Sequence, residues 1–222
     1  QQKTAFFRYT KGNATIRNLT IHGTIETGAK FAAGIVSQAN DNTTIENCAS
    51  YVQINSFAGG DCTHGGLIGY TQGSGTVRVN NCLFAGSING ESTNSCGGIC
   101  GWSEVNTVMS NCLISGDFNI QPDGCATFAR GSRTTIENCY YKEGFMEAGD
   151  FERGTKVSVE QLASGEVGLK LDANNTEHAW FQRIGEDESP SPIAERGVIY
   201  NVGKYYGNAF DNETLQAFIT TV

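Results

Sequence analysis

Apolar and polar positions alternate along most of the first 141 residues. In residues 19–25, Leu and Ile alternate with Thr, and residues 114–120 show the same spacing of apolar positions. A period of two is typical of strands with one buried face. The segment is rich in β-branched residues and poor in helix formers, which favours strands over helices. The pattern therefore predicts short strands joined by turns.

One short motif, aliphatic-x-Asn-Leu/Cys, recurs through this segment. The spacings between its Asn residues are 29, 34, 30 and 27 residues. Five matches at one period indicate a repeat in which each unit buries its apolar face against its neighbours. The five copies begin at Ile16, Ile45, Val79, Met109 and Ile136.

A second motif, a small residue followed by larger ones, stays in step with the first. Its spacings are 29, 32, 32 and 28 residues, for Ala5, Gly34, Gly66, Gly98 and Ala126. We predict an all-β repeat fold, a parallel β-solenoid of four to five coils, with the small residues at a corner where the backbone approaches its surroundings closely. A leucine-rich repeat is the alternative, but it needs more Leu and usually a helical return.

The Asn of the first motif marks another predicted corner. If the aliphatic residue points inward, Asn and the residue after it would both point inward, so the chain must bend. Asn tolerates left-handed backbone and bonds freed backbone groups. Stacked coils would space these residues ~4.8 Å apart, close enough for a hydrogen-bonded ladder. The predicted ladder is Asn18, Asn47, Asn81, Asn111 and Asn138.

The eight cysteines do not show the spacing of a zinc site. Four of them share the inward slot that Leu19 occupies in the first unit, which predicts a stack of buried, unmetallated thiols. These four are Cys48, Cys82, Cys112 and Cys139. A Cys62–Cys96 bridge between adjacent coils is possible if the protein is extracellular. A calcium role for Asp117 and Asp123 is a further alternative, but we predict no metal.

The glycine-rich segments 64–70 (HGGLIGY) and 96–102 (CGGICGW), with 44–48 (TIENC), resemble the GLUG motif. GLUG repeats occur in secreted and surface proteins of bacteria, including gut anaerobes, often inside larger adhesin-like chains. The resemblance covers about residues 5–141, and the last unit departs from it with Ala126-Thr127-Phe128. Segments 158–167 and 180–190 are similar to the tail that follows such repeats. The resemblance implies a secreted or cell-surface location and further domains upstream.

Charge divides the chain. Residues 1–141 hold 8 Lys/Arg and 9 Asp/Glu, a net of −1, whereas residues 142–222 hold 7 and 14, a net of −7. We predict a solenoid over 1–141 and an acidic, α-containing capping region over 142–222. Ser158 with Gln161 forms a capping box, and Val157 with Leu162 a hydrophobic staple. The helices and residues 180–181 (Trp-Phe) should close the open solenoid end, and a last helix should begin at Asp211.

The net charge and the lack of a long apolar run narrow the possible partners of the chain. The net charge of −8 argues against nucleic acid and anionic membranes as partners, and no apolar run is long enough for membrane insertion. The chain begins without Met and reads as a mature or trimmed fragment. We expect a non-catalytic extracellular or cell-surface module for adhesion or for binding a glycan or a host protein, without cofactors. The alternatives are a structural spacer and a β-helix polysaccharide lyase or glycosidase.

One column of residues suggests binding. It follows the glycine corner and reads Tyr9, Gln38, Tyr70, Trp102 and Arg130. The longest inter-motif stretch, residues 49–65, lies nearby and carries Phe57, Gly59, Gly60, Asp61 and His64. Solenoids often place such insertions on the binding face. We predict a shallow lateral groove with Tyr70 and Trp102 as ligand-binding residues; alternatively, the two rings stack on each other to protect the corner.

Overall fold

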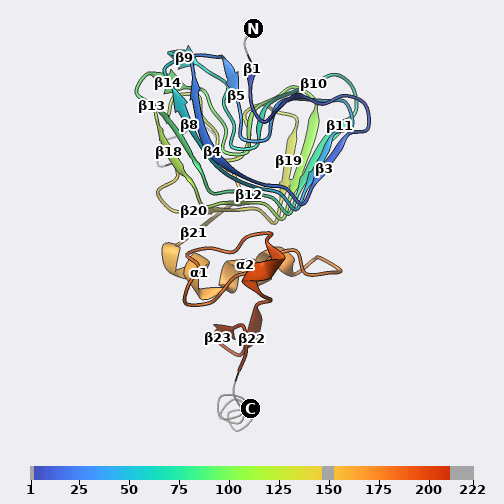
Figure 1. Ribbon diagram of the computed structural model, residues 1–222, viewed down its shortest axis with the longest axis vertical. Coiled ribbons are helices and arrows are strands. Elements are labelled where there is room, and N and C mark those ends of the chain that lie inside the picture. The colour runs from blue at the N-terminus through green and yellow to red at the C-terminus, as the bar shows by residue number, and fades with distance from the viewer. Residues whose placement is uncertain (1–2, 147–152, 211–222) are drawn as a thin grey trace.

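The computed structural model describes residues 3–146 and 153–210 and has a parallel β-solenoid as its main body. Each full coil contributes a strand to each of three parallel sheets, and the coils lie nearly on top of one another in Figure 1. The corner motifs predicted from the sequence keep the same register, since Ile16, Ile45, Val79, Met109 and Ile136 are successive partners. The predicted fold class is therefore confirmed.

Three sheets, named here B, C and D, enclose the core. Sheet B contains β2 (Phe7–Tyr9), β6 (Val36–Asn40), β10 (Ile68–Gln72) and β15 (Cys100–Ser103). Sheet C contains β3 (Thr15–Arg17), β7 (Thr44–Glu46), β11 (Thr76–Asn80), β16 (Asn106–Ser110) and β19 (Thr134–Glu137).

Sheet D is the longest of the three. It contains β4 (Thr20–Thr27), β8 (Ala49–Ser56), β12 (Leu83–Phe84), β13 (Ser87–Gly90), β17 (Leu113–Ile114), β18 (Asp117–Ile120), β20 (Tyr140–Lys142) and β21 (Thr155–Val157). Two short parallel pairs complete the coils: β1 (Lys3–Thr4) with β5 (Phe31–Ala32), and β9 (Gly60–Asp61) with β14 (Thr93–Asn94).

Each Asn of the first motif adopts left-handed backbone, with φ between 49° and 54°. The expectation that these side chains point inward is wrong. Asn18 is exposed, Asn47, Asn111 and Asn138 are partly exposed, and Asn81 is 9% exposed. The left-handed residue takes up the bend itself, so two outward residues precede the inward Cys, and the amide stays free to bond along the outer surface.

The second motif indents every coil. A side chain at Gly66 would collide with the Phe84 ring and the Gly98 carbonyl, and one at Gly34 would collide with Ser50. Ser50 and Phe84 belong to sheet D, so the segments that lead into β6 and β10 dip toward the opposite sheet. Figure 1 shows this dip between β5 and β10. Only glycine allows so close an approach.

The interior is packed with apolar side chains. Ile45, Val79 and Met109 are fully buried, as is Phe84, which fills the space below the indentation. Cys48, Cys82 and Cys112 are fully buried and Cys139 is 3% exposed. All eight thiols are free, so the Cys62–Cys96 bridge does not form. Instead Cys96 donates its backbone N–H to the sulfur of Cys125 at 3.3 Å.

The C-terminal region contains α1 (Val159–Ser164), α2 (Glu166–Asp172), the 3-10 helix η1 (Ala194–Arg196) and the antiparallel pair β22 (Tyr200–Val202) with β23 (Tyr205–Gly207). The capping box at Ser158 is formed with Gln161, as the sequence predicts. The predicted helix from Asp211 lies outside the described residues.

The helices cover the flank of the solenoid, not its open end, which corrects the sequence-based expectation. Leu162, Val167 and Trp180 pack on Leu83 and Leu113, which face outward from sheet D. Figure 1 shows this region beneath β12 and β20. Outward Leu residues expose an apolar strip on the sheet, and the helices bury it. Strand β21 pairs with β20, so sheet D continues beyond residue 141; the domain boundary itself stays a prediction.

Candidate ligand-binding groove

The indentation leaves a groove along the side of the solenoid, with a volume of about 400 Å³. We call it the lateral groove. One wall comes from Lys30, Phe31, Asp61 and Thr63 at the β5 and β9 edge. The other comes from Tyr70, Gln72, Trp102, Glu104 and Arg130 along sheet B and the coil that follows it.

Arg130 links the two walls. Its Nη1 lies 3.2 Å from Oδ1 of Asp61 and donates to the carbonyl of Ser95. Its guanidinium also lies 5.2 Å from the centre of the Trp102 ring, a cation–π distance. Arg130 therefore fixes the positions of an acid and an aromatic ring at once.

Asp61 is held as an anion at the mouth of the groove. Partial burial opposes ionisation, but hydrogen bonds from Thr63 and Lys30 and the charge of Arg130 outweigh it, so the pKa of Asp61 is lowered. Lys30 Nζ lies 3.0 Å from the carboxylate, which remains half-exposed. This carboxylate is a preorganised acceptor for hydroxyl or amide donors of a ligand.

Tyr70 closes one part of the groove. Its ring lies 4.3 Å from that of Phe31, and its hydroxyl bonds Gln38. Lys3 also bonds Gln38 and lies over the Tyr70 ring. These contacts leave Tyr70 only 9% exposed.

The two residues predicted to bind a ligand therefore have different roles in the structure. Tyr70 and Trp102 are register partners on neighbouring strands, and both line the lateral groove. Trp102 is 40% exposed and offers free aromatic surface, whereas Tyr70 mainly supports the wall. Among the ring contacts of the described residues, none joins these two, because Tyr70 packs on Phe31 and Trp102 on Arg130.

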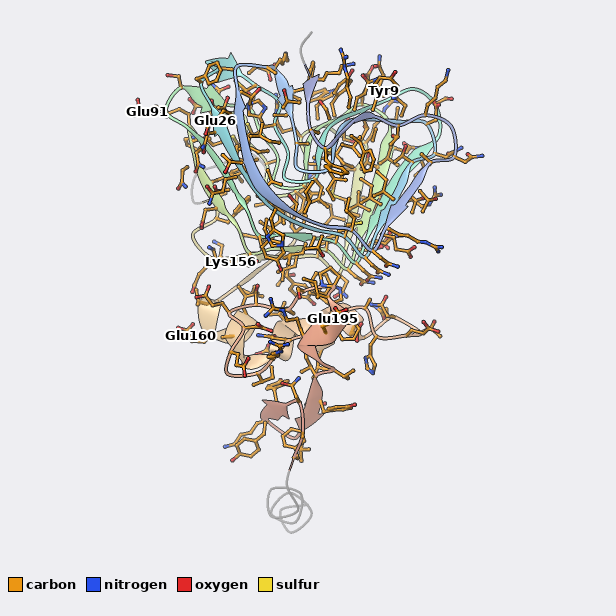
Figure 2. The ribbon with its side chains drawn as sticks, viewed as in Figure 1. Tyr9, Glu26, Glu91, Lys156, Glu160 and Glu195 are labelled. Carbon is orange, nitrogen blue, oxygen red and sulfur yellow. The ribbon has the colours of Figure 1, made fainter. Side chains whose placement is uncertain are left out.

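The remaining residues of the predicted face divide between surface and core. Tyr9 is 63% exposed and points away from the coil in Figure 2, while Phe57 is 76% exposed. His64 is fully buried, accepts the Ala32 N–H at 3.2 Å and lies 2.9 Å from Ser56 Oγ. Burial lowers the pKa of His64 to about 4. This Ser–His pair therefore supports the core and is closed to a substrate.

Sequence reasoning missed Lys30 and Phe31 as wall residues. They belong to no repeated motif, and they lie near Tyr70 because β5 packs beside β10 at the indentation. Their place three and four residues before Gly34 was the available signal, since a corner brings both of its flanks together.

A second ladder was also missed. On sheet D, Asn55 donates to Glu26 at 2.6 Å, Asn89 to Asn55 at 2.8 Å, and Asn119 to Asn89 at 2.8 Å. These residues are register partners on successive strands. Side-chain amides thus join four strands along this outer surface.

The residues that the structure describes contain no group of three or more His, Cys, Asp or Glu side chains placed to hold an ion. Asp117 pairs with Lys142 at 2.7 Å, and His178 with Asp172 at 2.7 Å. No described helix is long and apolar enough to cross a membrane.

Comparison with known proteins gives one informative likeness. No protein-family model matches the chain, and no curated protein does. Among solved structures, it is similar to a "putative immunoglobulin A1 protease" from Bacteroides ovatus, with a TM-score of 0.63 and 21% sequence identity. The match covers 84% of this chain and 61% of that protein. At this identity, the likeness shows a shared β-solenoid fold alone.

Proposed function

We propose that this chain is a non-catalytic binding module of a secreted or cell-surface bacterial protein, and that its lateral groove binds a glycan. The observation that carries the proposal is Trp102, a half-exposed indole fixed by Arg130 beside an ionised Asp61. Aromatic faces supply contact area for sugar rings, while neighbouring carboxylates and cations bond the hydroxyls. A glycan or a glycosylated host protein would be the partner.

Two further observations support this proposal. The groove runs along stacked coils, so an extended chain can contact equivalent positions on each coil. The GLUG-like segments and the likeness to a Bacteroides protein agree with a bacterial surface context, which is an argument by analogy. In that context the chain would be one part of a longer protein.

A glycan array on the purified protein, followed by calorimetry on the best ligand, tests the proposal. Trp102→Ala should weaken binding about tenfold or more, as expected for an aromatic anchor that the ligand covers. Tyr205→Ala is the matched control, because Tyr205 is 57% exposed but lies in β23, away from the groove. Binding that survives Trp102→Ala, or no binding on the array, would refute the assignment.

A further inference from the structure

A second depression, of about 510 Å³, lies on the outer face of sheet C. We call it the arginine depression. Its charged side chains are Arg78 on β11 and Arg133, which precedes β19, and both are exposed. Polar side chains surround them: Thr76, Asn106, Ser132, Thr134 and Thr135.

The two guanidinium groups have no acidic partner among the residues that the structure describes. Arg78 reaches only the carbonyl of its neighbour Thr76, at 3.4 Å, and no ion pair involves Arg133. Thr135 stands in register with Arg78 through Val108, two coils away, and Arg133 lies two residues before Thr135. The Cα atoms of the two arginines are therefore ~12 Å apart, from two strand spacings across the sheet and two residues along it. Two unpaired like charges in one depression favour an anion with two or more acidic groups.

The lining fits a hydroxyl-rich ligand. Side chains of Ser, Thr and Asn offer both donors and acceptors, as sugar hydroxyls do. None of the residues lining the depression is aromatic, so nothing there would stack on nucleic-acid bases.

The depression adjoins the lateral groove around one edge of the solenoid. In the fourth coil, Trp102 and Glu104 line the groove and Asn106 lines the depression. In the fifth, Arg130 lines the groove and Ser132 and Arg133 line the depression. A ligand in the groove therefore reaches the arginines by passing over a turn of one or two residues.

We infer that the ligand is an acidic glycan, whose carboxylate or sulfate groups bind Arg78 and Arg133 while a sugar ring rests on Trp102. This inference rests on the proposed function of the lateral groove. The chain carries a net charge of −8, so a polyanion would be repelled overall and would bind only where cations are gathered.

The test compares charged and neutral forms of the same polymer at low salt. Polygalacturonate against its methyl ester isolates the carboxylate, and dextran sulfate against dextran isolates the sulfate. The wild-type chain should bind at least one acidic form about tenfold more tightly than its neutral form. The double variant Arg78→Gln/Arg133→Gln should lose that preference and keep the weaker affinity for the neutral form.

Arg17→Gln is the matched control, because Arg17 is exposed on the same sheet but outside the depression. If Arg17→Gln costs as much as the double variant, general electrostatics explains the effect and the inference is wrong. Equal binding of acidic and neutral polymers, abolished by Trp102→Ala, would overturn the inference and leave the groove intact. Absence of binding to every polymer would refute the groove as well. Tighter binding of single-stranded RNA than of any glycan would identify a different ligand class.

Discussion

Asn175, between α2 and β22, donates a hydrogen bond from its side-chain amide to Oδ1 of Asn81 at 3.1 Å. It also accepts one from Asn111 at 3.2 Å, so it stands between two members of the Asn ladder. Two other links are direct, from Asn47 to Asn18 at 3.4 Å and from Asn138 to Asn111 at 2.8 Å. The C-terminal region therefore supplies the link between Asn81 and Asn111.

Two substitutions at Asn81 should separate its backbone role from its side-chain role. Asn81→Ala places a β-carbon in left-handed backbone, which costs about 1–2 kcal/mol, and also removes the bond to Asn175. Asn81→Gly removes only the bond and should cost about 1 kcal/mol. Urea denaturation measures both. Equal losses for Ala and Gly would show that the left-handed conformation is not the constraint.

Gly66→Ala should destabilise the solenoid by about 1–3 kcal/mol, because the new methyl group meets the Phe84 ring and the Gly98 carbonyl. Gly59→Ala is the control, since its β-carbon would lie 3.8 Å from Ser92, an ordinary contact, and its φ is not positive. It should change the free energy of unfolding by less than about 0.5 kcal/mol. Similar losses at both positions would contradict the close approach at the indentation.

His64 should make stability depend on pH. Its pKa is lowered from 6.5 to about 4 in the folded chain, so between these values the unfolded chain binds more protons. Stability from this residue is complete above about pH 6.5 and is lost as pH falls to about 4, by roughly 3 kcal/mol. An NMR titration should show the ring neutral at pH 5. A His64→Gln variant should lose this part of the pH dependence of stability. Titration of the native His64 ring near pH 6.5 would contradict the lowered pKa.

The two tryptophans should differ in exposure to solvent. Trp102 is 40% exposed and Trp180 is 1% exposed. Acrylamide should quench only the part of the fluorescence that comes from Trp102. In the Trp102→Phe variant, the remaining fluorescence comes from Trp180 and should resist quenching. Groove ligands should protect the quenchable share. Equal quenching of wild type and Trp102→Phe would place Trp180 at the surface.

The thiols test whether burial or ionisation controls reactivity. The pKa of Cys125 is lowered to about 7, mainly by a hydrogen bond from Cys96, while burial raises that of Cys100 to about 12. Both are fully buried, so neither should react quickly with maleimide in the native state at pH 7.5, although the pKa of Cys125 is lowered. Denaturation should expose eight reactive thiols. Rapid native labelling of Cys125 alone would show that its surroundings open.

The repeat was predictable because stacking forces equivalent residues into equivalent environments. The Asn corner, the Gly indentation and the Cys slot recur from coil to coil, so a pattern that is weak in one coil becomes clear over five. The direction of the Asn side chains was mispredicted, because alternation was carried through a residue whose positive φ breaks it. The position of the helices on the flank of the solenoid could not be predicted either. Leu83 and Leu113 look like core residues in the sequence, and only the sheet register shows that they face outward.

The groove could be predicted only in part. Trp102 and Asp61 stood near recurring corners, and the structure places both in the groove. Phe31 and Lys30 came from a stretch without a motif. Exposure could not be predicted from the sequence, because Tyr70 and Trp102 occupy the same repeat position. Their exposure differs because Phe31, Gln38 and Lys3 cover Tyr70, whereas Arg130 contacts Trp102.

The indentation has a consequence for how such a surface could change over evolution. Every coil supplies its own stretch of wall in a fixed register, so duplication of one coil would lengthen the groove by ~4.8 Å without disturbing the existing contacts. The length of the groove and its specificity are then independent. The number of coils sets the length of ligand that can bind, and the residue at the Trp102 position of each coil sets which chemical group binds there. A lineage could alter one without altering the other.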